Sequence, residues 1–326
     1  MKKTLLTLVL LIAVAVGGVA LTLSKPYKGF EGIKFTEFAK GTGTMEIARR
    51  LEEAGVVQSR WQLMAARALK PSVKFQAGEY KFERAASVWD VVERLRKGDV
   101  YLVELRIPEG YNVYEIAHAV ESAGMVKAPA FVAAAQNPSM IRDLAPTAPS
   151  LEGFLFPSNY HVPRKITAEA LCRVLTDQFR REWKAVGGGP TVLDTVSLAS
   201  LVEKETGAPE ERAVVSAVYH NRLRKGMKLD ADPTTIYAAM LLGKWRGAIY
   251  KSDLEREHPY NTYRTVGLPP GPIANPGRAA IAAALKPAPA EFIYFVARPD
   301  GSGRHIFSKS YSDHARAVAA WRRVKG

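Results

Sequence analysis

The longest apolar run in the chain extends from Thr4 to Leu23. The segment "TLLTLVLLIAVAVGGVALTL" carries no charge, and Lys2 and Lys3 precede it. Roughly 20 apolar residues form a helix long enough to cross a bilayer, and the positive N-terminal flank favours a cytoplasmic N-terminus. We therefore predict an uncleaved membrane anchor over residues 1–24. A cleavable signal peptide, whose apolar core is usually about 7–15 residues, is the alternative, and either segment exports the rest of the chain.

Residues 25–149 alternate between helical and strand patterns. The segment "SVWDVVERLRKG" has apolar residues at helical spacing between an N-capping Ser87 and a terminating Gly98. Residues 77–82 and 100–110 alternate apolar and polar positions, as strands do. The segments "GTMEIARRLEEAGVV" and "YNVYEIAHAVESAGMV" match at seven positions with an offset of 69, which indicates a helix that is used twice. Such small modules resemble LysM, a fold associated with binding cell-wall glycan, although a spacer fits the same pattern.

The Pro- and Ala-rich stretch "DLAPTAPS" predicts a domain boundary, with a second domain over residues 150–326. This domain ends with "EFIYFVARPDGSGRHIFSKS", which predicts two strands around a turn at Asp300 to Gly303, and then a helix through Trp321. We therefore expect an α+β protein, with a membrane anchor, a LysM-like small α+β region over 25–149 and a mixed α+β second domain.

Residues 192–206 predict a buried helix that ends on two glutamates. At roughly 100° per residue, Glu203 projects between Val196 and Ala199, whereas Glu205 lies nearer the boundary of the apolar face. A solvated residue at a frayed helix end is the commoner fate of a glutamate. The apolar flank of Glu203 instead predicts that desolvation raises its pKa and keeps the acid neutral.

A neutral carboxylic acid in an apolar cleft can protonate the leaving oxygen of a glycosidic bond. Ordinary glycosidases add a second carboxylate, and Glu205 or Asp232 is a candidate for that role. Glu203 and Glu205 are two positions apart on one helix, so they face different directions and do not easily flank one bond. We therefore also consider a mechanism in which a single carboxylate cleaves the glycosidic bond.

Further candidate residues lie in the loops after this helix. Asp232 precedes Pro233, and helix capping explains both residues without a catalytic role. The Pro- and Gly-rich stretch "HPYNTYRTVGLPPGPIANPG" predicts a stiff loop, on which Asn261 and Tyr263 suit sugar recognition. Turn propensity for Asn261 and core packing for Tyr263 are the alternatives.

Composition narrows the functional classes. The 326 residues contain 46 Lys and Arg against 32 Asp and Glu, a net charge of +14 that favours a polyanionic partner or an anionic membrane. No nucleic-acid-binding motif accompanies this charge, so we predict no nucleic acid partner. The single Cys172 excludes an intramolecular disulfide, and the six histidines form no metal-binding motif. We therefore predict no metal.

Five motifs occur in the order and approximate spacing of the endolytic murein transglycosylases, the MltG or YceG-like type. They are "LEGFLFPSNY", "LASLVEKETG", "VYHNRLRKGMKLDADPTTIY", "YNTYRTVGLPPGPIANPG" and "YFVARPDGSGRHIFS". The resemblance covers nearly the whole chain. It implies a lyase that cleaves the β-1,4 bond between N-acetylmuramic acid and N-acetylglucosamine in nascent peptidoglycan, leaves a 1,6-anhydro end, and needs no cofactor.

The resemblance also implies roles for residues. Glu203, the first glutamate of "VEKE", is the catalytic acid and base. Glu205 is a neighbour that sets polarity, and Asn261, Tyr263 and Tyr160 line the cleft. The family implies action beside peptidoglycan synthases (penicillin-binding proteins), with the catalytic domain in the periplasm and the anchor in the inner membrane. A water-using muramidase and a non-catalytic wall-binding scaffold are the alternative functions.

Overall fold

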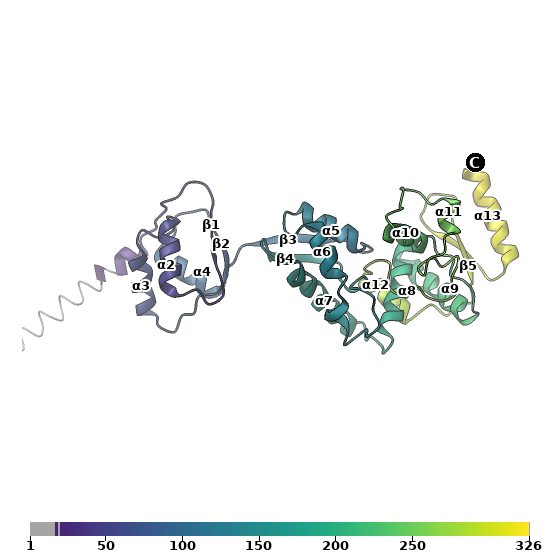
Figure 1. Ribbon diagram of the computed structural model, residues 1–326, viewed down its shortest axis with the longest axis horizontal. Coiled ribbons are helices and arrows are strands. Elements are labelled where there is room, and N and C mark those ends of the chain that lie inside the picture. Colours follow the sequence, from purple (N-terminus) through teal and green to yellow (C-terminus); the bar gives the residue numbers. More distant parts are fainter. Residues whose placement is uncertain (1–16, 19, 326) are drawn as a thin grey trace, which may run out of the picture. The chain divides into compact units, whose positions relative to one another are not determined.

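The computed structural model describes residues 17, 18 and 20–325 (Figure 1). Most of the predicted anchor, residues 1–24, lies outside these described residues. Within the described residues, no helix combines the length and the apolar character that a membrane span requires. The chain forms two compact units, one ending at Val103 and the other beginning at Glu104.

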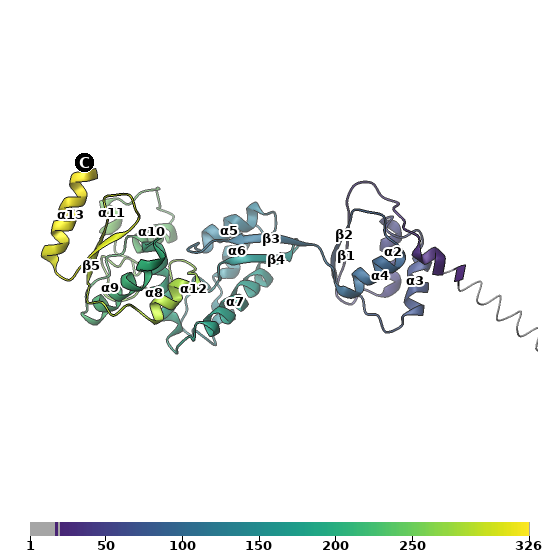
Figure 2. The ribbon, with the colours of Figure 1, turned by 180° about the vertical axis from the view of Figure 1, so that it is seen from behind.

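Among the described residues, the first unit contains an antiparallel strand pair and three labelled helices, after a helical segment that ends at Ser24 (Figures 1 and 2). The strands pair in the register Thr36↔Tyr80. Its core consists of side chains from both strands and all three helices, including Phe38, Leu51 and Leu95. The elements are β1 (Lys34–Phe38), α2 (Thr44–Glu53), α3 (Arg60–Leu69), β2 (Gly78–Phe82) and α4 (Val88–Lys97).

The predicted helix after Ser87 is confirmed as α4. Ser87 and Asp90 form a capping box, and Gly98 ends the helix in the left-handed conformation, where a glycine is least strained. The reused helix is also confirmed, because both matching segments are helical and the glycine that follows each helix, Gly55 and Gly124, has a positive φ. A small α+β module is therefore present, while a specific LysM identity stays a prediction.

The second unit begins with a strand pair beside three α-helices. It continues into a helical region, a second strand pair and a final helix. The first part comprises β3 (Leu102–Ile107), α5 (Val113–Ser122), α6 (Ala128–Ala135), η1 (Pro138–Ile141), β4 (Ser158–Pro163) and α7 (Ala168–Ala185). The second part comprises α8 (Val192–Glu205), η2 (Pro209–Glu211), α9 (Arg212–Arg224), α10 (Asp232–Leu241), α11 (Lys251–Leu254), α12 (Arg278–Leu285), β5 (Tyr294–Ala297), β6 (His305–Ser308) and α13 (Tyr311–Lys325). The predicted C-terminal hairpin and helix are thereby confirmed.

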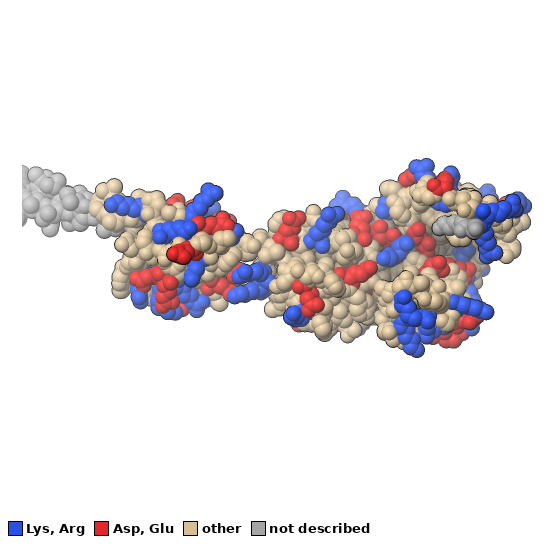
Figure 3. Space-filling view, turned by 90° about the horizontal axis from the view of Figure 1, so that it is seen from above, with Lys and Arg blue, Asp and Glu red and all other residues tan. Residues whose placement is uncertain are grey.

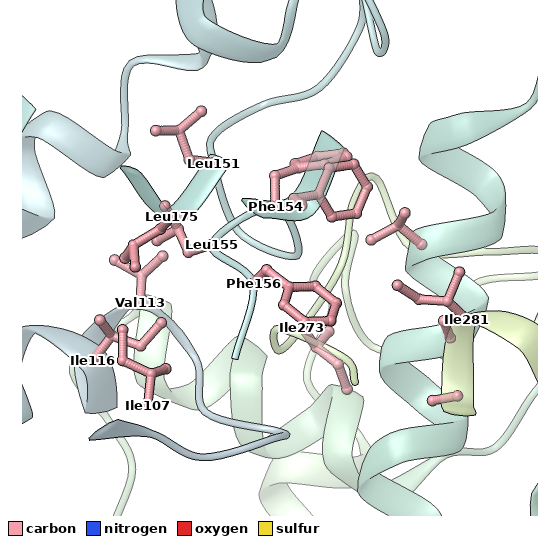
Figure 4. Close-up of a cluster of buried hydrophobic side chains, with 14 of the residues drawn as sticks. Ile107, Val113, Ile116, Leu151, Phe154, Leu155, Phe156, Leu175, Ile273 and Ile281 are labelled. Carbon is pink, nitrogen blue, oxygen red and sulfur yellow. The ribbon is translucent and has the colours of Figure 1, made fainter. Parts of the chain in front are cut away.

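The division between the units differs from the predicted boundary near residue 150. Side chains before that position, such as Ile107 and Val113, pack in the same core as Leu151 and Phe154 (Figure 4). Ala148 of the Pro- and Ala-rich stretch is itself buried in this core. A Pro-rich composition marks a turn but does not tell whether the turn is buried, so the stretch is an internal connection of the second unit.

Candidate active site

Helix α8 forms the centre of the candidate site and is enclosed on nearly all sides. Val196, Ala199 and Val202 are fully buried, as the helical pattern predicted. The polar side chains Ser197 and Ser200 are buried too. The Ser200 hydroxyl donates to the carbonyl of Ser197 at 2.7 Å and accepts from the backbone N–H of Ile273 at 3.1 Å. This serine therefore joins the helix to the loop that leads into α12.

Glu203 lies in the last turn of α8 with only 6% of its side chain exposed. The backbone N–H of Gly277 donates to its Oε2 at 2.9 Å, and Nη2 of Arg212 lies 3.5 Å from its Oε1. Gly277 is the N-cap of α12, so the positive end of that helix faces the carboxylate. The burial agrees with the prediction, but the surroundings are not purely apolar, because two N–H donors interact with the carboxylate.

A second carboxylate, Glu109, lies beside this site. It belongs to the turn after β3, and a Cβ atom added to Gly277 would overlap its Oε1. Burial and the charge of Glu203 raise the pKa of Glu109, and the charge of Arg212 partly opposes this effect. The sequence interpretation missed both Glu109 and Arg212, because their motifs lie 94 positions before and 9 positions after Glu203 with no periodic relation to it.

A buried network holds this turn against the α12 loop. Glu152 accepts hydrogen bonds from the backbone N–H of Val113 at 2.9 Å, the Tyr237 hydroxyl at 3.0 Å and the Asn275 amide at 2.8 Å. Burial raises the pKa of Glu152 to about 7. The backbone N–H of Gly110 in turn donates to the carbonyl of Asn275 at 2.9 Å. These bonds fix the spacing between Glu109 and the N-terminus of α12.

Glu205 lies in a different environment from Glu203. Burial, with a smaller contribution from the charge of Asp232, raises the pKa of Glu205 to about 7. Asp232 accepts a hydrogen bond from the Tyr263 hydroxyl at 2.6 Å. The structure therefore brings together three of the predicted residues, Glu205, Asp232 and Tyr263, in a group separate from the partners of Glu203. Asp232 is the first residue of α10 and Ala231 is the N-cap, a shift of one position from the prediction.

Asn261 and Tyr160, also predicted to line the cleft, are both buried. The Asn261 amide donates to the backbone carbonyls of Asp253, Leu254 and Arg256 at 2.8–3.2 Å, and its Oδ1 accepts from the backbone N–H of Tyr263 at 3.0 Å. The Tyr160 hydroxyl donates to the carbonyl of Phe156 within the core. Neither side chain is placed for direct contact with a ligand, and Asn261 instead shapes the loop that carries Tyr263.

A groove of about 400 Å³ is lined mainly by residues that follow Glu109 in the chain. Its lining includes two aromatic rings and several polar side chains that could contact a sugar. The lining residues are Tyr111, Asn112, Tyr114, Glu115, His118, Ala119 and Met240. These residues, apart from Met240, lie within residues 25–149, for which the sequence predicts a separate N-terminal region.

The remaining predictions concern charge, metal and Cys172. On the face drawn in Figure 3, Lys and Arg are interspersed with Asp and Glu. Among residues 17, 18 and 20–325, no group of three or more His, Cys, Asp and Glu side chains is arranged to hold a metal ion. Cys172 is buried, and burial raises the pKa of its thiol to about 12.

Comparisons with known proteins agree with the motifs. A profile of the YceG-like family matches residues 36–320. An endolytic murein transglycosylase of Bacillus subtilis is 29% identical over 300 residues, covering 85% of this chain and 81% of the relative. An endolytic murein transglycosylase of Streptococcus pneumoniae is 28% identical over 86% of this chain, which spans only 57% of that relative. The crystal structure of a yceG-like protein from Listeria monocytogenes matches 88% of this chain and 99% of its own, with 28% identity and a TM-score of 0.57. The chain therefore belongs to the YceG-like family.

Proposed function

We propose that this chain is a peptidoglycan lytic transglycosylase that cleaves glycan strands internally, at the β-1,4 bond between N-acetylmuramic acid and N-acetylglucosamine. Membership of the YceG-like family and the names of the relatives support this activity. The single observation that carries the proposal is the carboxyl group of Glu203, almost fully buried and in contact with Arg212 and the N-terminus of α12.

The site supplies an acid and then a base from one residue. The Glu203 carboxylic acid protonates the glycosidic oxygen, and the bond from that oxygen to C1 of the muramoyl sugar breaks. The C6 hydroxyl oxygen then bonds to C1, and its proton passes to the Glu203 carboxylate. No water is consumed, and the product carries a 1,6-anhydro ring.

Arg212 and the Gly277 N–H contribute at the moment when Glu203 has given up its proton. Both groups point at the carboxylate oxygens before the reaction begins. Preorganised donors of this kind stabilise the developing negative charge without reorganising during the reaction. They therefore lower the cost of proton transfer to the leaving oxygen.

We further propose that residues 1–24 anchor the protein in the inner membrane and that the rest of the chain acts in the periplasm. The uncharged run from Thr4 to Leu23 supports the anchor. In this position the enzyme would meet nascent strands beside peptidoglycan synthases and end their elongation. The first unit then serves as a LysM-like glycan-binding module or as a spacer.

Asp232 is a poor second carboxylate for a water-using muramidase. Its side chain is hydrogen-bonded to Tyr263, and its charge acts on Glu205. The burial of Glu203 also argues against a scaffold without catalysis. A scaffold has no need of a buried carboxyl group, because a solvated glutamate would serve it equally well.

The test is mass spectrometry of the fragments that the full chain, in detergent, releases from uncrosslinked glycan strands. A lyase yields fragments lighter by one water than the hydrolytic products, and Glu203→Gln yields none. Reducing ends would indicate a muramidase, and intact strands after incubation with folded protein would indicate a scaffold.

A further inference from the structure

Two carboxylates, Glu109 and Glu203, lie against Gly277. The glycine N–H donates to Glu203 at 2.9 Å, and the space where its side chain would stand is occupied by the Glu109 carboxylate. The glycine has φ −75° and ψ 171°, a conformation that any residue adopts. The close approach of Glu109, and not the backbone conformation, is therefore what favours glycine at this position.

The two carboxylates differ in their partners. Glu203 meets Arg212 and a backbone N–H, whereas the Glu109 carboxylate has no hydrogen bond to any residue of the described chain. Glu109 is also exposed, and the residues that follow it, Tyr111 and Asn112, line the aromatic groove. Its oxygens are thus accessible to solvent next to Gly277, the residue that donates to Glu203.

The charges around Glu109 and Glu203 favour one proton shared between the two carboxylates. With one proton, two carboxylates and the Arg212 guanidinium carry no net charge, which lowers the cost of partial burial. The cationic side chains on the neighbouring helices bind other groups. Lys204 of α8 donates to the carbonyl of Gly110 at 3.3 Å, and Arg278 of α12 pairs with Glu182 of α7 at 2.5 Å.

We propose that Glu109 is a second carboxylate of the active site and that it shares one transferable proton with Glu203. This inference rests on the proposed lyase activity. The pair delivers its proton to the glycosidic oxygen as the bond to C1 breaks. As the C6 oxygen bonds to C1, the pair recovers one proton from the C6 hydroxyl, so the site ends each cycle in its starting state.

The test is the pH dependence of kcat/KM for anhydro-product formation by the full chain in detergent. Glu109→Gln should lower kcat/KM by about 100-fold and move the alkaline limb down by about one pH unit, because the remaining acid loses a negative neighbour that helped it to keep its proton. Glu109→Asp, which keeps the charge, should leave the limb close to its wild-type position. Glu104→Gln is the matched control, since Glu104 is exposed on β3 and belongs to neither group of carboxylates.

A second variant tests the geometry. Gly277→Ala places a methyl group where the Glu109 carboxylate lies, so it should shift the limb in the same direction. In a Glu109→Ala background the same alanine should cause no further loss, because the carboxylate it displaces is already absent. Additive losses would show that Gly277→Ala does not act through Glu109, and would contradict the shared site.

The outcomes separate this proposal from the proposed function. If wild type forms anhydro ends, Glu203→Gln does not, and the alkaline limb of Glu109→Gln stays at its wild-type position, the lyase stands and the role of Glu109 is overturned. An equal loss in the Asp and Gln variants also overturns it. If wild type forms no anhydro ends, the proposed function fails, and this proposal with it.

Discussion

The two glutamates at the end of α8 lie two residues apart and are surrounded by different chemistry. Glu203 meets the N-terminus of α12 and Arg212, next to an open second carboxylate. Glu205 lies near Asp232, and burial raises its pKa to about 7. A helix turns successive side chains by roughly 100°, so neighbouring acids can face separate sites. Burial alone therefore does not distinguish the acid that we propose for catalysis; the donors around its carboxylate separate Glu203 from Glu205.

Arg212→Met should produce the largest change after loss of the acid itself. It removes the cation beside Glu203, so kcat/KM should fall by about 100-fold or more. The alkaline limb should move to higher pH, because without the cation the proton is harder to remove. This shift is opposite to that expected for Glu109→Gln. Arg212→Lys keeps the charge and should recover part of the rate, while an unmoved limb in Arg212→Met would contradict the assigned role.

Glu205→Gln tests the environment of Glu205 through the pH dependence of the free energy of unfolding. An ordinary glutamate has a pKa near 4.5, and in the folded chain the pKa of Glu205 is raised to about 7. The contribution of Glu205 to stability is therefore fully present below pH 4.5 and is lost as the pH rises towards 7. A neutral Gln avoids this loss, so the free energy of unfolding of Glu205→Gln should be about 3 kcal/mol higher than that of wild type at pH 8 and close to wild type at pH 4. Urea denaturation at both pH values measures this difference.

If the difference in free energy of unfolding between Glu205→Gln and wild type were the same at pH 4 and pH 8, the contrast drawn between Glu203 and Glu205 would be wrong. Glu152 is the internal reference, because burial also raises its pKa to about 7. Glu152→Gln should lose stability at both pH values, since Gln offers one acceptor oxygen where Glu152 accepts three hydrogen bonds on two.

Tyr263→Phe should have the smallest effect. It removes the hydroxyl that donates to Asp232, an exposed carboxylate that can bind water instead. We expect a loss of about 1 kcal/mol in the free energy of unfolding. The rate of anhydro-product formation should stay within about threefold of wild type. A hundredfold loss of rate would instead place the Glu205 side of the helix at the chemistry and contradict the assignment of Glu203.

Local pattern was sufficient to predict α8, its burial and the separation of its two glutamates. These properties depend on the helical period and on the apolar residues within one segment. The α4 capping box and the C-terminal hairpin were predictable for the same reason, because each signal lies within a few neighbouring residues.

The partners of Glu203 were not predictable, because they come from segments that only tertiary packing brings together. Gly277 lies 74 positions after Glu203 and Glu109 lies 94 positions before it, and neither carries a local signal. Asn261 illustrates the opposite limit. Its Pro- and Gly-rich surroundings predicted an exposed loop residue, but three backbone carbonyls bind its amide in the interior.

The most direct test of the central claim compares Glu203→Gln and Glu205→Gln, assayed side by side for anhydro ends formed from uncrosslinked glycan strands. Both substitutions remove one carboxylate from the same helix turn, so each controls for the other. We predict that Glu203→Gln binds glycan but forms product at least about 1,000-fold more slowly than wild type, while Glu205→Gln stays within about tenfold. An inactive Glu205→Gln beside an active Glu203→Gln would contradict the claim that Glu203 is the catalytic acid.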